Sequence, residues 1–213
     1  MSLSSHARLA PRAPRQERGE RRVAALLDAA ASVIAEVGYE TATMSEIAER
    51  AGACIGSLYQ FFPNKQAVSQ ALRAKYGHEI EQMWAPLEAR CASLTVRQMV
   101  SHLTADMVGF IQQRPAFLPL LDAPACTRSA PMRQLLRQQL VRCFVTMRPR
   151  LRQEKAAQMA AVCLQIIKSM NQLYAETAAS ERSAVVEECK FVLTCYLTSR
   201  LETGRHLGAG PKK

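Results

Sequence analysis

The stretch from Ala51 to Lys65 reads AGACIGSLYQFFPNK and places two glycines and three aromatic residues within one short segment. Gly52 can adopt the left-handed backbone conformation that a tight turn requires. Asn64 is a residue type that often caps the start of a helix. The stretch therefore predicts a tight turn, a short helix over about residues 55–61, and a longer helix that begins at Lys65.

Two helices are predicted before this stretch. Apolar residues recur at helical spacing over 21–37, and Gly38 supplies the glycine that commonly ends a helix. Thr43 followed three residues later by Glu46 forms a capping-box pattern, which predicts a short helix over 44–51. Two short helices joined by a glycine-containing turn and braced by a preceding helix make a helix-turn-helix.

The short helix over 55–61 is expected to have one core-facing side and one exposed side. Leu58 and Phe62 are four residues apart, so they face the same way and anchor the helix in a small core. Ser57, Tyr59 and Gln60 project in other directions. A phenol hydroxyl can donate a hydrogen bond to a phosphate oxygen, so these side chains favour a surface that contacts DNA.

Residues Arg22 to Leu72 resemble the DNA-binding domain of the TetR family of bacterial transcriptional regulators. The matching run is LLDAAASVIAEVGYETATMSEIAERAGACIGSLYQFFPNKQAV. It contains a first helix that ends in Gly-Tyr, then T-x-x-x-I-A-x-x-A-G, then G-S-L-Y-x-x-F-x-x-K. The resemblance implies an all-helical homodimer in which each subunit carries a three-helix DNA-binding head and a larger helical body that binds a small ligand.

The resemblance also implies roles for single residues in the head. It assigns phosphate contacts to Thr43, Tyr59 and Lys65, and base contacts to Ser57 and Gln60. The partner would be double-stranded DNA that carries an inverted-repeat operator.

Six arginines lie within the first 22 residues, and Arg21 and Arg22 are the nearest to the head. Basic arms of this kind can follow phosphates or enter a minor groove, and we expect Arg18, Arg21 and Arg22 to contribute to DNA binding. The alternative for the more distant arginines is a solvated tail with weak, salt-sensitive attraction.

Composition narrows the class of protein. The net charge of +10 indicates attraction to polyanions without specifying a function. No apolar run approaches the roughly 20 residues that a membrane span needs, and the N-terminus lacks the apolar segment of a secretory signal, so we expect a cytoplasmic protein with no membrane partner.

The chain has seven cysteines without CxxC spacing and four scattered histidines. We therefore expect no disulfide, no metal site and no cofactor. The chain shows no set of residues typical of a catalytic site, so an enzyme is the least supported function.

We expect an all-α fold in three parts: a flexible basic arm (1–19), the helix-turn-helix domain (20–66), and a helical effector-binding and dimerisation domain (67–213). Helices in the last part are predicted near 65–84, 95–113, 131–148, 154–178 and 182–203, with proline-bearing segments such as RPAFLPLLDAP between them.

A ligand pocket would be lined by the middle helices. Its candidates are Trp84, Leu103, Met107, Phe110, Phe117, Leu121, Phe144, Met147, Cys163 and Met170. Methionines and aromatic residues at helical spacing are equally typical of an ordinary core, so that alternative stays open.

The last two helices have apolar surfaces wider than one core contact needs, which favours a dimer interface on them. Its candidates are Met159, Ile167, Tyr174, Val185, Cys189, Val192 and Tyr196. The alternative is a monomer with a thick core.

The arginines between 133 and 152 allow two interpretations: they attract an anionic effector, or they form a solvated face that adds to the field around DNA.

Cys54 precedes the short helix at a position where the family often has a polar capping residue. A thiol caps poorly, but at a helix N-terminus it can become reactive. The sequence thus predicts a dimeric repressor that a small-molecule effector releases from its operator. The alternative is a redox-sensing regulator of the same fold that acts through a cysteine such as Cys54.

Overall fold

The computed structural model describes residues 14–122 and 130–202, with side chains described over 17–120 and 133–202. The helices are α1 (Pro14–Thr41), α2 (Met44–Arg50), α3 (Ile55–Phe61), α4 (Lys65–Arg90), the 3-10 turn η1 (Cys91–Ser93), α5 (Val96–Gln113), α6 (Phe117–Asp122), α7 (Ala130–Met147), α8 (Gln153–Glu176) and α9 (Arg182–Leu201). These ranges contain no strand, so the predicted all-α class is confirmed.

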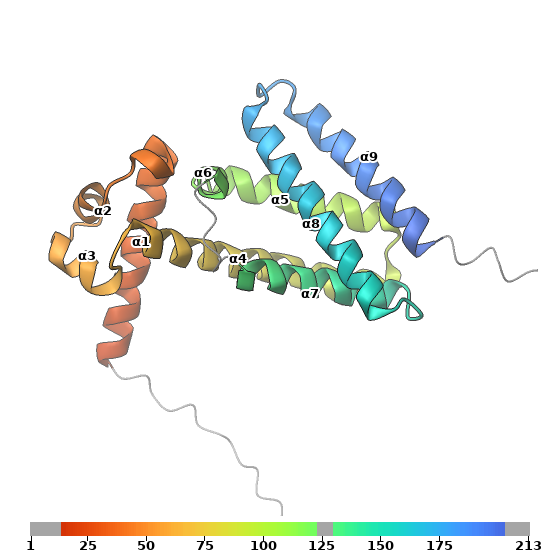
Figure 1. The fold of residues 1–213 in the computed structure, drawn as a ribbon, viewed down its shortest axis with the longest axis horizontal. Coiled ribbons are helices and arrows are strands. Elements are labelled where there is room, and N and C mark those ends of the chain that lie inside the picture. The colour runs from red at the N-terminus through yellow and green to blue at the C-terminus, as the bar shows by residue number, and fades with distance from the viewer. Residues whose placement is uncertain (1–13, 123–129, 203–213) are drawn as a thin grey trace, which may run out of the picture.

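Helices α1, α2 and α3 form a small head at one end of the molecule, and α4 leads from it into the body (Figure 1). Apolar side chains from all four helices fill the core of the head: Leu26, Ile34, Ile47, Leu58 and Leu72 are each fully buried. The helical periods read from the sequence therefore correspond to one packed cluster.

Two glycines set the backbone path of the head. Gly38 has φ 79° and interrupts α1, after which one further turn runs to Thr41. Gly52 has φ 57° and makes the turn between α2 and α3. Both values lie in the left-handed region, which glycine adopts without the clash that a Cβ would cause.

The predicted helix caps of the head are present. Thr43 and Glu46 form a complete capping box at the start of α2. The Asn64 side chain accepts a hydrogen bond from the Ala67 amide at 2.8 Å and caps α4. These bonds pair backbone donors that would otherwise lack a partner.

The body is a bundle of long helices. α7 runs along α4, α8 crosses this pair, and α9 returns antiparallel to α8, while α5 packs against α9 (Figure 1). The parallel direction of α4 and α7 follows from two bonds between them: Gln139 donates to the Glu81 carbonyl, and Arg142 pairs with Glu88.

Two helices are longer than predicted, and one helix was not predicted. α1 starts at Pro14, within the segment expected to be a flexible arm, because proline is tolerated in a first turn. α4 continues through Pro86 to Arg90, since Leu87 is buried in the core. The proline-bearing segment after α5 contains α6, where Phe117 and Leu120 are buried; the sequence analysis did not predict this helix.

α6 connects the head with the body. It packs against α1 of the head and against α4 and α8 of the body. The Arg73 guanidinium on α4 donates to the Leu120 carbonyl of α6 at 2.5 Å. A second link joins Lys75 Nζ of α4 to Asp28 Oδ1 of α1 at 2.6 Å. These contacts join the head to α4 and α6 of the body.

Candidate functional site

The polar side of α3 is exposed, as the sequence predicts. Tyr59 is 50% exposed, Gln60 is exposed and Ser57 is half-buried. Leu58 and Phe62 lie on the opposite side and are buried in the head core. A short helix anchored along one side and open along the other has the shape that a DNA groove accommodates.

Thr43 is exposed at the start of α2, with its hydroxyl directed toward Glu46. The hydroxyl donates to Glu46 Oε2 at 2.8 Å and accepts from the Glu46 amide at 3.2 Å. The hydrogen bonds from the Thr43 side chain and backbone lower the pKa of Glu46. A phosphate contact by the Thr43 hydroxyl proton would require this proton to turn away from Glu46.

Lys65 already holds the end of α1. Its Nζ donates to the carbonyls of Tyr39 and Glu40 at 2.8 and 2.7 Å and lies 4.8 Å from the centroid of the Tyr39 ring. An ammonium group has three donors, so one N–H remains for a phosphate oxygen.

The arginines at the start of the head lie on α1. Arg21 is exposed and lies 3.7 Å from Glu17, while Arg22 is half-buried. Of the other arm arginines, Arg8 and Arg12 lie outside the described residues, and so does the side chain of Arg15.

Cys54 is the exposed N-cap residue of α3, and its side chain forms no capping hydrogen bond. This agrees with the expectation that a thiol caps the helix poorly.

A cavity of about 870 Å³ lies in the body between α4, α5, α6, α7 and α8. Three of the predicted pocket residues line it: Trp84, Met107 and Phe117. Its size falls within the range of small-molecule sites.

Most of the remaining pocket candidates pack elsewhere in the core. The side chains away from the cavity are those of Leu103, Phe110, Phe144, Met147, Cys163 and Met170. The side chain of Leu121 lies outside the described residues. Helical periodicity identifies core-facing positions, but it does not distinguish a side chain that meets a void from one that meets another helix.

Much of the cavity lining was not predicted from the sequence. The additional residues include Arg73, Tyr76, Ile80, Leu120, Arg137, Leu164, Ile167, Lys168 and Asn171. One signal was available, because residues 73, 76, 80 and 84 follow one side of α4 at helical spacing.

Two aromatic residues of the lining, Tyr76 and Phe117, pack edge to face with each other and with Phe110, which is not a lining residue. The Tyr76 ring lies 5.7 Å from Phe110 and 6.0 Å from Phe117, and the two phenylalanine rings lie 5.1 Å apart. Burial raises the pKa of Tyr76 to about 12, so its hydroxyl stays protonated at neutral pH.

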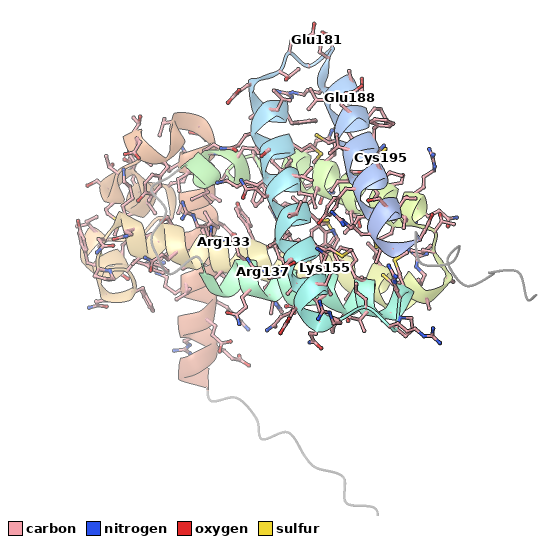
Figure 2. The ribbon with its side chains drawn as sticks, turned by 45° about the vertical axis from the view of Figure 1, so that its right-hand side comes forward. Arg133, Arg137, Lys155, Glu181, Glu188 and Cys195 are labelled. Atoms are coloured by element: carbon pink, nitrogen blue, oxygen red, sulfur yellow. The ribbon has the colours of Figure 1, made fainter. Side chains whose placement is uncertain are left out.

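α8 and α9 expose large apolar side chains: Val162 and Leu173 on α8, and Phe191 and Val192 on α9. Figure 2 shows Glu188 and Cys195 along α9 on its exposed side.

The predicted interface residues divide into three groups. Val192 is exposed, while Val185, Cys189 and Tyr196 are half-buried. Met159, Ile167 and Tyr174 are buried in the core of the chain, so the prediction that they form an exposed interface differs from the structure.

Across the described ranges, no helix is long and apolar enough to cross a membrane. Among the same residues, no group of three or more His, Cys, Asp and Glu side chains is placed to hold a metal ion.

The head and body define the class: a helix-turn-helix DNA-binding protein with an all-helical second domain. The family model described as bacterial regulatory proteins of the tetR family matches residues 26–72. The model described as the tetracyclin repressor-like C-terminal domain matches residues 95–197. Together these matches cover most of the chain, which belongs to the TetR family of transcriptional regulators.

Curated relatives match over shorter segments. The A-factor receptor protein of Streptomyces griseus is 42% identical over 66 residues, which are 30% of this chain and 24% of that protein. The HTH-type transcriptional repressor KstR of Mycolicibacterium smegmatis is 31% identical over 91 residues, which are 42% of this chain and 43% of that protein. The matches thus span less than half the length of these relatives.

Solved structures share the fold along nearly their whole length. A TetR-family regulator from Streptomyces coelicolor has a TM-score of 0.68 at 22% identity, covering 84% of this chain and 99% of that one. The regulator FadR from Bacillus subtilis, solved in complex with stearoyl-CoA, has a TM-score of 0.61 at 19% identity, covering 78% of this chain and 96% of that one.

Proposed function

We propose that the protein is a dimeric repressor that binds an inverted-repeat operator in the cytoplasm and is released from it by a small molecule. The exposed polar side of α3 carries this proposal. Ser57 and Gln60 would face base edges, while Tyr59, Thr43 and Lys65 would contact phosphates, with Arg21 and Arg22 adding attraction at the start of α1. On this reading the helix-turn-helix domain covers residues 20–66.

The body, over residues 67–213, would bind the effector in the cavity. Phe117 and Leu120 of α6 line the cavity, and α6 also packs against α1 of the head. An effector that fits one arrangement of these helices better than another would shift the head between two positions. A molecule that binds both arrangements equally would have no effect on DNA binding.

The relatives support an effector of this general kind. The A-factor receptor protein is named for the ligand it receives, and the B. subtilis FadR structure holds stearoyl-CoA. Both names support a small-molecule effector for this chain without specifying its chemistry.

The exposed apolar faces of α8 and α9 support a homodimer. Val162, Leu173, Phe191 and Val192 would meet their copies across a two-fold axis, with the half-buried Val185, Cys189 and Tyr196 beside them. A dimer places two heads on one duplex, and its symmetry matches that of an inverted repeat.

DNA binding to the region upstream of the protein's own gene tests the proposal, measured as a salt series. The wild-type protein is expected to bind one short inverted repeat with a steep salt dependence. Tyr59→Ala should weaken binding about tenfold on all sequences, because a phosphate contact carries little sequence information. Gln113→Ala, an exposed substitution on α5, serves as the control. Unchanged affinity in Tyr59→Ala would remove Tyr59 from the interface.

The exposed thiol of Cys54 supports a second candidate function, a redox-sensing regulator. Oxidation would add bulk at the start of α3, on the surface proposed to meet DNA. In this case peroxide should release the wild-type protein from its operator but leave a Cys54→Ser variant bound. Release of both proteins by peroxide would rule out this site.

A further inference from the structure

The cavity of the body has a lining of one charge sign. Among the lining residues that the structure describes, five are cationic (Arg73, Arg133, Arg137, Arg142 and Lys168) and none is acidic. Arg142 is neutralised from outside the lining by Glu88, at 2.6 and 3.0 Å. Arg137 and Lys168 form no ion pair within the described ranges. Both side chains are exposed, so they lie at the open rim of the cavity, where water screens part of their charge.

The positive charge gathers toward one end of the cavity. Because α7 runs parallel to α4, with Gln139 bonded to the Glu81 carbonyl, Arg133 lies toward the Arg73 end of the α4 lining and Arg137 lies near its middle. Figure 2 shows Arg133 and Arg137 together on α7. This end is the one nearer the head, since α4 begins there.

The rest of the lining is apolar and long. Ile80, Met107, Phe117, Leu120 and Ile167 form much of it and are buried. Along α4 the lining runs from residue 73 to residue 84, which at 1.5 Å per residue is about 16 Å. An elongated apolar group therefore fits the cavity better than a compact polar one.

Two buried polar atoms in the wall lack a hydrogen-bond partner among the described residues. They are Nε1 of Trp84 and Oδ1 of Asn171, on side chains only 2% and 3% exposed. An unpaired buried polar atom is destabilising, and the indole N–H can only donate. An occupant with an acceptor atom near Trp84 or a donor near Asn171 would pair these atoms.

We propose that the cavity binds an anionic amphiphile, a molecule with a long apolar chain and a negatively charged carboxylate or phosphate head. The anionic head lies between Arg137 and Lys168 at the rim of the cavity, and the chain extends along the apolar lining. This inference rests on the proposed function only in treating the cavity as an effector site. Of the two interpretations of the arginines between 133 and 152, it favours attraction of an anionic effector over a solvated face.

The test uses four hexadecyl probes of different head charge, each below its micelle concentration: palmitate, hexadecyl phosphate, hexadecanol and hexadecyltrimethylammonium. Trp84 is the only tryptophan of the chain and lines the cavity, so its fluorescence reports occupancy without DNA. We expect palmitate or hexadecyl phosphate to bind one molecule per protomer, at least about tenfold more tightly than the cationic probe. The anion that binds more tightly shows whether the cavity prefers a carboxylate or a phosphate head.

Variants test where the head lies. Arg137→Gln combined with Lys168→Gln should weaken the anionic probes about tenfold and leave hexadecanol within about twofold. Arg97→Gln combined with Arg150→Gln removes the same charge from exposed positions outside the lining, and it should leave all four probes unchanged. Equal loss in both double variants would overturn the placement.

The outcomes separate this inference from the proposed function. Equal affinity for anionic and cationic probes, or binding of many molecules per protomer, would overturn the anionic class even if the protein binds its operator. Operator binding is measured separately with and without the preferred anion. Tight anion binding that leaves operator affinity unchanged would confirm the ligand class and refute its role as the effector.

Discussion

Thr43 combines a structural role with a proposed functional one. Its capping box pairs backbone donors at the start of α2, and its exposed hydroxyl lies on the face proposed for DNA. Thr43→Ala should lower the free energy of unfolding by about 1 kcal/mol, because alanine cannot cap. Thr43→Ser keeps the cap and serves as the control in urea unfolding. Equal stability of all three proteins would contradict the capping role.

The same cap gives a pH dependence with a defined sign. The folded protein lowers the pKa of Glu46 below its ordinary value through hydrogen bonds from Thr43. Its contribution to stability is therefore present above the ordinary glutamate pKa and is lost as the pH falls through the folded value. The stability difference between wild type and Thr43→Ala should accordingly shrink as the pH falls below about 4. Urea unfolding at several pH values measures this change.

At the scale of the element, α3 depends on two glycines with different roles. Gly52 has a positive φ, so Gly52→Ala should destabilise the protein by about 1–2 kcal/mol. Gly56 lies within α3 with no atom near an added Cβ, so Gly56→Ala should stabilise the helix by about 0.5–1 kcal/mol. Thermal unfolding measures both changes, and each variant is the control for the other.

Gly56→Ala also tests how closely α3 approaches DNA. The added methyl group would stand on the exposed surface of the helix, so operator affinity should fall although stability rises. A variant that is more stable and binds DNA normally would show that the Gly56 surface lies away from the duplex.

At the scale of the whole molecule, the proposed dimer would place two heads on one operator. Phe191 is 66% exposed on α9, and Phe191→Glu would place two charges at the two-fold axis of the proposed interface. The variant should dimerise at least about tenfold more weakly, since one central aromatic side chain often contributes about 2 kcal/mol or more. Sedimentation equilibrium measures the change, and Ser101→Glu on the exposed side of α5 is the control. A variant that stays fully dimeric would exclude this face.

The residues of the head were predictable because local rules determine them. Gly52, the Thr43 capping box and the Asn64 cap were each read from sequence and are present in the structure. Their chemistry acts over three or four residues, a distance at which sequence order and spatial neighbourhood coincide. The exposed side of α3 followed from the same short-range periodicity.

The body was predictable only in outline. Its long helices appear near their expected ranges, but α6 was missed because tertiary burial of Phe117 and Leu120 stabilises a helix too short to form alone. Of the predicted interface residues, Met159 and Tyr174 turned out to be buried within the protomer. The wide apolar surfaces predicted on α8 and α9 include exposed residues such as Phe191 and Val192, and their role in a dimer stays a prediction.

The sequence by itself determined the helical class, the helix-turn-helix and its family, since each depends on contacts between residues close along the chain. Only the tertiary structure decided which side chains surround the cavity. Arg73, Arg137, Lys168 and Asn171 come from three helices far apart in sequence, and they meet because α4, α7 and α8 pack together. No periodicity within one helix encodes that meeting, because it depends on how separate helices cross.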